Sequence, residues 1–322
     1  MRSDWVAATV RAKAMARRRA GAGLCRDAAA LPTLQQALEL LSSTGYGPEL
    51  AGSADLATAQ QATRRSVLWQ LRVLAGWLPV AGARMVRAAG AAFELANITV
   101  LHRRLQENTD AADTGQEHRV APLPGYFELG GLATAWPRLS RAGSPAELVE
   151  LLRTSPWGDP GPDLSDTLSV VWLRRLAASA PQTMNWTVAG AALIAARRIL
   201  LPAAPDRQAL PAGTPRLETL LQPLLGRTWQ DTNDVAGFRA ALPAAAARAL
   251  EGVEDAGGLW RAEAALRSQI EDDGFRLLRS GLPGPDVAVG AVTVLAVDAW
   301  RVRAALAAAA TGGGSEVLDA VA

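Results

Sequence analysis

The densest set of side chains with metal-binding chemistry is the acidic run Glu271, Asp272 and Asp273. Carboxylates hold Mg²⁺ in all-helical enzymes that transfer prenyl groups, and that chemistry needs carboxylates one helical turn apart on two facing helices. Here the three are consecutive, Gly274 follows them, and no partner motif is present. The pattern therefore favours a solvated helix end, and we expect no metal site.

Other residue types with catalytic chemistry are too few or wrongly spaced. His102 and His118 are the only histidines, and neither has a carboxylate or a second histidine at the spacing of metal ligands. A phosphate-binding loop needs a lysine after its glycines, and the only lysine, Lys13, is not in such a loop. No Gly-x-Ser-x-Gly elbow is present. We expect no catalytic residue and no cofactor, and the chain is not predicted to be an enzyme.

Composition argues for a folded protein that does not bind nucleic acid. Of the 322 residues 49% are hydrophobic, and 33 Lys and Arg face 31 Asp and Glu, for a net charge of +2. The basic run Arg17 to Arg19 lacks the aromatic interleaving of a nucleic-acid site, which favours a solvated face or an acidic protein partner. The single cysteine, Cys25, excludes an internal disulfide and fits a reducing compartment.

The longest apolar runs are too short to cross a bilayer. Val188 to Ala196 ends at Arg197, and Val287 to Val297 ends at Asp298, whereas a span needs about 20 residues. The N-terminal residues lack the apolar stretch of a secretory signal. We expect no membrane span and a cytoplasmic location.

Hydrophobic residues recur at helical spacing along the whole chain, and no alternation typical of strands persists, so an all-α fold is predicted. Expected N-caps are Asp4, Thr33, either Ser53 or Asp55, Ser144 with Glu147 three residues on, and either Asp163 or Ser165. The helices expected from these signals cover about residues 4–19, 33–42, 55–78, 80–104, 129–139, 144–153, 163–176, 184–201, an Ala-rich stretch to 250, 259–270 and 285–310.

One helix-to-turn element recurs. Residues 38–47 read LELLSSTGYG and residues 149–158 read VELLRTSPWG, so that a Leu pair, a turn, an aromatic residue and a glycine share one spacing. A weaker third copy, one residue shorter, covers residues 224–229. We call these the first, second and third corners and predict that their aromatic residues are buried repeat markers rather than ligand contacts: Tyr46, Trp157 and Trp229.

Two polar or proline-rich stretches divide the chain into three. Residues 107–118 are polar throughout, and residues 202–215 hold four prolines. We expect three similar helical domains over residues 1–110, 111–212 and 213–322. A basic pair follows the last apolar run of each domain, and we predict that these arginines contact a partner, with solvated helix ends as the alternative: Arg103, Arg104, Arg197, Arg198, Arg301 and Arg303.

Four stretches resemble one known family, the C/d-type rotor subunits of the A-type and V-type ATPases, which include the d-type subunit of the eukaryotic V-ATPase. They are Val10 to Ala12 followed by LQQALELLSSTGYG, Phe93 to Ile98 with Asn97 as a further marker, Leu148 to Gly158, and Val292 to Arg303. The chain departs from the family in the last of these, where Trp300 to Arg303 replace an acidic residue and an asparagine.

The resemblance implies three helical domains arranged as a funnel with pseudo-threefold symmetry. It implies a non-catalytic rotor component of the central stalk, which couples ATP turnover or synthesis to proton or other ion transport. Its partners would be the D and F proteins of the shaft and the membrane proteolipid (c/L) ring, and it would be peripheral to the membrane through the complex. The alternatives are an all-α small-molecule enzyme and a generic helical scaffold.

Overall fold

The computed structural model describes residues 3–114, 123–200, 215–232, 234–314 and 318, and these residues are all-helical, with fifteen α-helices, short 3-10 turns and no strand. Their packing separates into two compact units: a first unit of residues 1–89 and 263–322, and a second unit of residues 90–262. The predicted all-α class is therefore confirmed, whereas the threefold division stays a prediction.

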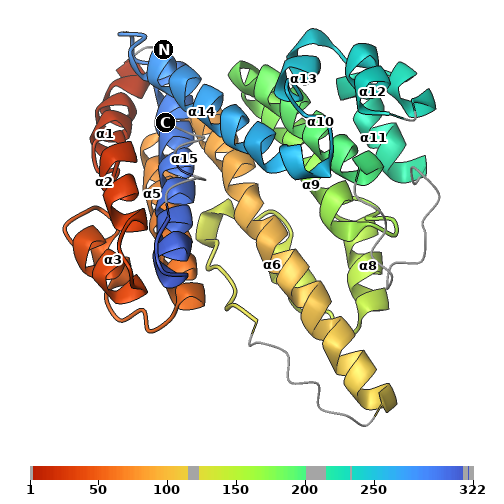
Figure 1. Ribbon diagram of the computed structural model, residues 1–322, viewed down its shortest axis with the longest axis horizontal. Coiled ribbons are helices and arrows are strands. Elements are labelled where there is room, and N and C mark those ends of the chain that lie inside the picture. The colour runs from red at the N-terminus through yellow and green to blue at the C-terminus, as the bar shows by residue number, and fades with distance from the viewer. Residues whose placement is uncertain (1–2, 115–122, 201–214, 233, 315–317, 319–322) are drawn as a thin grey trace. The chain divides into compact units, whose positions relative to one another are not determined.

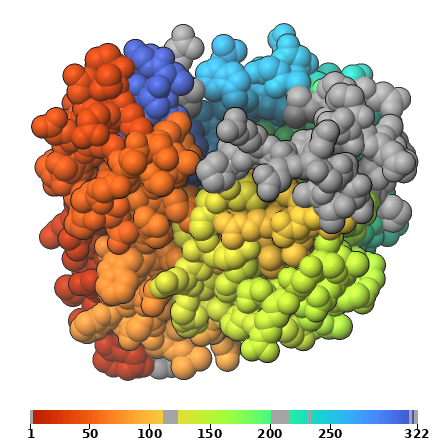
Figure 2. Space-filling view, turned by 90° about the horizontal axis from the view of Figure 1, so that it is seen from below, coloured from red at the N-terminus to blue at the C-terminus, as the bar shows by residue number. Residues whose placement is uncertain are grey.

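The first unit is organised around its last helix. α15 (Pro285–Ala310) packs against α1 (Val6–Ala16), α2 (Ala22–Ala29), α3 (Leu34–Leu41) and α5 (Leu56–Trp77), as Figure 1 shows. It buries residues on every side, as expected of a helix with apolar residues all round. Beyond α15, the Gly314 amide donates to the Ala29 carbonyl at 3.0 Å, and Figure 2 shows this blue end against the red and orange segment. The unit also holds α4 (Gly47–Leu50), the start of α6 (Val80–Thr114) and most of α14 (Leu259–Leu278).

The second unit is contiguous in sequence. It contains the rest of α6, and in it α10 (Met184–Leu200) packs against α9 (Leu164–Ser179), α11 (Pro215–Leu225) and α13 (Ala244–Ala249). Its shorter elements are η2 (Gly130–Leu132), α7 (Trp136–Leu139), α8 (Pro145–Arg153), η3 (Pro181–Thr183), η4 (Thr228–Asp231), α12 (Val235–Ala241) and η5 (Ala256–Gly258).

Three predicted N-caps are confirmed. The Thr33 hydroxyl accepts from the Gln36 amide at 3.3 Å, Ser144 accepts from the Glu147 amide at 3.2 Å, and Asp55 forms a capping box with Thr58. The cap predicted at Asp4 is wrong, because residues 3–5 form a 3-10 turn and Trp5 precedes α1. Asp163 precedes α9 without a capping bond, and its carboxylate pairs with Arg198 instead.

Several element boundaries differ from those expected. The sequence does not predict α2, because glycine at position 21 is typical of a helix end. In the structure Gly21, with a φ of 85°, is instead the residue that precedes α2. Residues 107–114, expected in a linker, continue α6, and residues 115–118 lie outside the described residues. The acidic run 271–273 lies inside α14 and not at a helix end. The Ala-rich helix is two helices, α12 and α13, separated at Leu242 and Pro243.

α14 and α15 cross at two glycines. A Cβ built on Gly290 would lie 2.5 Å from the Gly274 carbonyl oxygen and 2.8 Å from the Leu278 amide nitrogen. Both obstacles are backbone atoms, so the helices cannot keep this crossing if a methyl group is added. Glycine at 290 therefore sets the approach of the two helices within the first unit.

We predict that Gly290→Ala destabilises the first unit by roughly 1–3 kcal/mol, the usual cost of overpacking. Gly76→Ala in α5 is the matched control, because a Cβ there meets no atom within 4 Å. The control is expected to raise the free energy of unfolding by up to about 1 kcal/mol through helix propensity. Urea unfolding of both variants checks this, and equal effects would contradict it.

No helix in the described part of the chain is both long enough and apolar enough to cross a membrane.

Candidate functional site

The first and second corners share their hydrogen bonds atom for atom. In the first, the Thr44 hydroxyl donates to the Leu41 carbonyl at 2.6 Å and accepts from the Tyr46 amide at 3.2 Å. In the second, the Ser155 hydroxyl donates to the Leu152 carbonyl at 2.7 Å and accepts from the Trp157 amide at 3.1 Å. The two turns are thus one structural element used twice.

In the first unit, the aromatic residue of the corner binds a buried carboxylate on α15. Asp298 is 0% exposed and accepts from the Tyr46 hydroxyl at 2.8 Å, the Ala20 amide at 2.9 Å and the Gly21 amide at 2.7 Å. We call these four residues the Asp298 network. It joins the first corner and the start of α2 to α15.

In the second unit, the corresponding carboxylate is on α6. Glu94 is 0% exposed and accepts from the Trp157 indole Nε1 at 2.8 Å, the Ala135 amide at 2.8 Å and the Thr134 amide at 2.5 Å. We call these four residues the Glu94 network. It joins the second corner and the start of α7 to α6.

The two networks correspond in their backbone donors as well. Gly21 is the N-cap residue of α2 and Ala135 is the N-cap residue of α7, and in each network the carboxylate accepts from the N-cap amide and from the amide before it. A carboxylate at this place satisfies two backbone donors and matches the positive end of the helix dipole. Each carboxylate therefore fixes where a helix begins relative to its corner.

The third corner does not repeat this arrangement. Trp229 lies in η4, donates from Nε1 to the Gly226 carbonyl at 3.0 Å, and packs edge-on against Phe238. The long helix α10 packs against α11, α12 and α13. It has no acidic residue, so it offers no carboxylate to Trp229. The predicted burial of the three aromatic residues is confirmed, with exposures of 3% for Tyr46, 1% for Trp157 and 7% for Trp229.

The first and second corners each bind a buried carboxylate on a long helix. The second corner binds α6, which precedes it in the chain, and the helices after the third corner pack against α10, which precedes them. The first corner binds α15, which comes near the end of the chain.

Burial of the Asp298 network shifts the pKa of the ionisable groups in and around it. Burial raises the pKa of Asp298, against the opposing effect of its three hydrogen bonds and of the Arg19 charge. Burial and the Asp298 charge raise the pKa of the Cys25 thiol to about 12 and that of Tyr46 well above its usual value. Cys25 is therefore a neutral thiol at physiological pH.

A guanidinium adjoins the Glu94 network. Arg175 on α9 lies over the Trp157 ring, 5.0 Å from its centre, and its Nη2 donates to the Thr134 hydroxyl at 3.1 Å. Burial lowers the pKa of Arg175, and the Glu94 charge partly offsets this. Asn97, one turn beyond Glu94, is 1% exposed and binds both the amide and the carbonyl of Phe127, at 2.7 and 2.9 Å.

The six arginines predicted to contact a partner lie in different environments. Arg103 and Arg197 are exposed, and Arg197 pairs with Asp166 at 3.5 Å. Arg104 donates to the Pro124 carbonyl at 2.9 Å and lies over the Tyr126 ring, and Arg198 pairs with Asp163 and Asp166.

The third pair lies on α15. Arg301 is 4% exposed and pairs with Glu271, which is 9% exposed, and Arg303 is half-buried. The interpretation of residues 271–273 as a solvated helix end is therefore wrong for Glu271. In the described residues no group of three metal-ligating side chains comes together, and His118 lies outside them.

The two carboxylates are not among the predicted site residues. In the sequence, Glu94 stands out only within a family-like stretch, and Asp298 only as the end of an apolar run. An isolated acidic residue in a helix that is otherwise apolar is a usable signal, because such a residue is seldom buried without partners.

Comparison of the chain with known protein families and with curated proteins finds no match.

Proposed function

We propose that this chain is a non-catalytic rotor component of the central stalk of a V/A-type ATPase. It would connect the D and F proteins of the shaft to the membrane proteolipid ring and transmit torque between them, at the cytoplasmic face of the membrane. One observation carries the proposal: the same corner, with the same aromatic-to-carboxylate bond, recurs in the two packing units.

The contacts of the first and second corners are those that a closed ring of three repeats would need. If each corner binds the long helix of the preceding repeat, and the first binds that of the last, the repeats close on themselves. Closed repetition is how a funnel of three domains with pseudo-threefold symmetry would be built, and closed cyclic contacts are usual in symmetric assemblies. The two buried carboxylates would make the joints at the first and second corners rigid, which torque transmission requires.

Exposed side chains supply surfaces for two partners. Trp77 and Val80, at the junction of α5 and α6, are 55% and 72% exposed, and we assign these two side chains to the apolar contact. Arg103 and Arg197 are exposed cations on the long helices α6 and α10. These features suit a connector with one apolar and one charged contact.

Co-purification tests the function. A tagged chain, recovered from detergent-solubilised membranes of its own host, is expected to bring with it the D and F proteins of the shaft and the proteolipid ring. Removing the chain is expected to uncouple ATP hydrolysis from ion transport. Recovery of the chain without shaft or ring would overturn the proposal and favour a generic scaffold.

Charge reversal tests the arginine contacts separately. We expect Arg103→Glu combined with Arg197→Glu to lower recovery of the shaft proteins about tenfold, because rim charges steer and hold a complementary partner. Arg141→Glu, another exposed arginine, is the matched control and should not change recovery. Unchanged recovery with the double variant would remove these arginines from the contact without affecting the main proposal.

A further inference from the structure

The exposed side of α5 in the first unit carries both tryptophan and arginine. Trp69 and Trp77 are 54% and 55% exposed, and Val80, at the start of α6, is 72% exposed. Arg72 lies over the Trp69 ring, 5.9 Å from its centre. The end of α5 and the start of α6 therefore present large apolar side chains together with a guanidinium group.

The start of α1 continues this apolar surface. A Cβ built on Gly82 would lie 2.7 Å from the Trp5 ring and 2.9 Å from the Leu78 side chain, so Trp5 packs into the bend between α5 and α6. Val6, the next residue, begins α1 and is 48% exposed. The exposed apolar side chains beside the bend thus come from two separate segments of the first unit.

The charge of this region is positive. Residues 56–93 contain five arginines and no aspartate or glutamate. Arg65, at one end, pairs with Glu49 at 3.5 Å, and the exposed Asp4 lies next to Trp5 at the other. Three further arginines of the five are exposed between these ends. We define the α5–α6 surface by its apolar and basic side chains: Trp69, Arg72, Trp77, Val80, Arg84 and Arg87.

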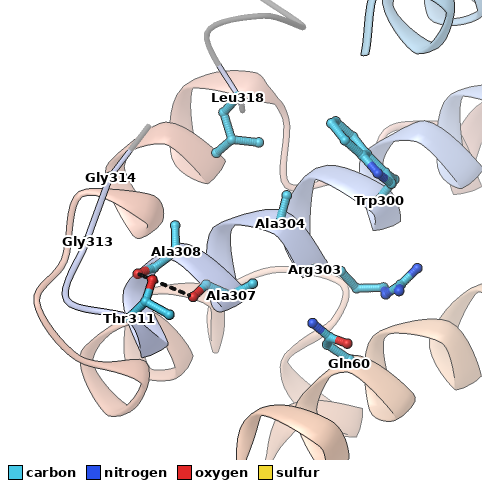
Figure 3. Close-up of a pocket in the computed structure, with 10 residues that line it drawn as sticks. All are labelled: Gln60, Trp300, Arg303, Ala304, Ala307, Ala308, Thr311, Gly313, Gly314 and Leu318. Carbon is cyan, nitrogen blue, oxygen red and sulfur yellow. Dashed lines mark hydrogen bonds between the residues drawn. The ribbon is translucent and has the colours of Figure 1, made fainter. Parts of the chain in front are cut away.

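The opposite side of α5 is used in packing. α5 packs on α15, and Figure 3 shows Gln60 of α5 lining one hollow with Arg303 of α15. Gln60 precedes Trp69 by about two and a half helical turns, which puts the two on opposite sides of α5. The side that carries Trp69 is therefore directed away from the core helix of the first unit.

We propose that the α5–α6 surface docks on an anionic lipid bilayer, with its apolar side chains at the level of the headgroups and its arginines on the lipid phosphates and carboxylates. Tryptophan is enriched at the membrane–water interface, and anionic lipids attract arginines near the surface. The inference rests on the proposed function for its place at the membrane. It gives the apolar contact of Trp77 and Val80 a partner, the lipid around the proteolipid ring.

Two other anionic partners fit this surface less well. Single-stranded nucleic acid binds by stacking bases on aromatic rings, and Arg72 already covers one face of the Trp69 ring. An acidic polypeptide would pair with the arginines, but charge pairing alone leaves Trp77 and Val80 in water. A lipid surface accommodates both kinds of side chain, because an arginine stem can lie along apolar groups while its guanidinium group stays hydrated.

Sedimentation of the purified full chain with vesicles tests the proposal. We expect binding to vesicles of phosphatidylcholine and phosphatidylserine in about a 7:3 ratio, and much weaker binding to phosphatidylcholine alone or at high salt. Arg72→Gln with Arg84→Gln should weaken binding about 25-fold, or about fivefold for each charge. The matched control, Arg141→Gln with Arg239→Gln, removes the same charge at exposed positions of the second unit and should bind as the wild type does.

Tryptophan variants test the apolar part of the contact. Trp77→Ser is expected to weaken binding about fivefold or more, because less apolar area leaves water on docking. Trp260→Ser is the matched control and should bind as the wild type does, since Trp260 is 39% exposed in the second unit and has Arg261 over its ring at 5.0 Å, as Trp69 has Arg72. Both changes are at exposed side chains, so both variants are expected to fold.

Four results would each overturn the proposal. They are no binding to the phosphatidylserine vesicles, equal binding with and without phosphatidylserine, wild-type binding by the double arginine variant or by Trp77→Ser, and tighter binding of polyglutamate or single-stranded DNA than of vesicles. The vesicles contain neither shaft nor ring, so such a failure would leave co-purification as the separate test of the rotor function.

Discussion

Glu94→Ala is expected to remove a large share of the stability of the second unit. The variant leaves three donors without an acceptor: the buried amide of Ala135, the buried indole of Trp157 and the half-buried amide of Thr134. At about 1–3 kcal/mol for each unsatisfied donor, the loss should reach roughly 4 kcal/mol or more. Domains are commonly stable by only about 5–15 kcal/mol, so this is a large share.

Urea unfolding followed by tryptophan fluorescence measures the effect of Glu94→Ala. The matched control is Glu150→Ala on α8, whose side chain is 66% exposed and pairs with Arg153 at the surface. The control should change the free energy of unfolding by less than about 1 kcal/mol, as is usual for exposed ion pairs. A loss below about 1 kcal/mol for Glu94→Ala would show that the network does not hold the second unit together.

Arg301→Ala is expected to destabilise the first unit by about 3–5 kcal/mol, because it leaves the Glu271 carboxylate buried without its ion pair. Replacing both residues, as Arg301→Met with Glu271→Met, should restore most of the loss, since well-packed apolar residues often replace a buried ion pair at little cost. A double-mutant cycle of Arg301→Met, Glu271→Met and the double variant therefore separates the interaction between the two charges from the cost of burying each one.

The control for this cycle is an ion pair on α14, the helix that carries Glu271, in which the arginine is exposed and the aspartate half-buried. Arg276, whose side chain is 71% exposed, pairs with Asp273, and Arg276→Ala should change the free energy of unfolding by less than about 1 kcal/mol. If the double methionine variant is as unstable as Arg301→Ala, the cost comes from packing and not from the uncompensated charge.

Local signals in the sequence predict the helices well where one residue decides the outcome. Thr33, Asp55 and Ser144 cap helices through hydroxyl or carboxylate groups that act within three residues, so no tertiary information is needed. The first and second corners are also visible in the sequence, because their hydroxyl, aromatic residue and glycine lie within one turn. Gly21 is misleading because the same positive φ can end one helix and begin another.

The long-range bonds are not visible in the sequence. Asp298 accepts from Ala20 and Gly21, which are 278 and 277 residues away, and no periodicity or cap rule connects such positions. The prediction for Glu271 is wrong for the same reason, since its partner Arg301 is on a different helix and makes burial of the charge possible. Sequence patterns predict the contacts of a residue within its own helix. Whether a charged side chain is buried depends on partners from distant parts of the chain, which such patterns do not show.

The place of α15 at the centre of the first unit has a consequence for how the chain is made. Residues 1–89 pack on a helix that leaves the ribosome only after the contiguous second unit has been synthesised. At about 5–20 residues per second, the N-terminal helices must wait roughly 10–45 seconds for that partner. During translation the second unit can fold first, while α1, α2, α3 and α5 expose apolar faces that a chaperone would have to shield.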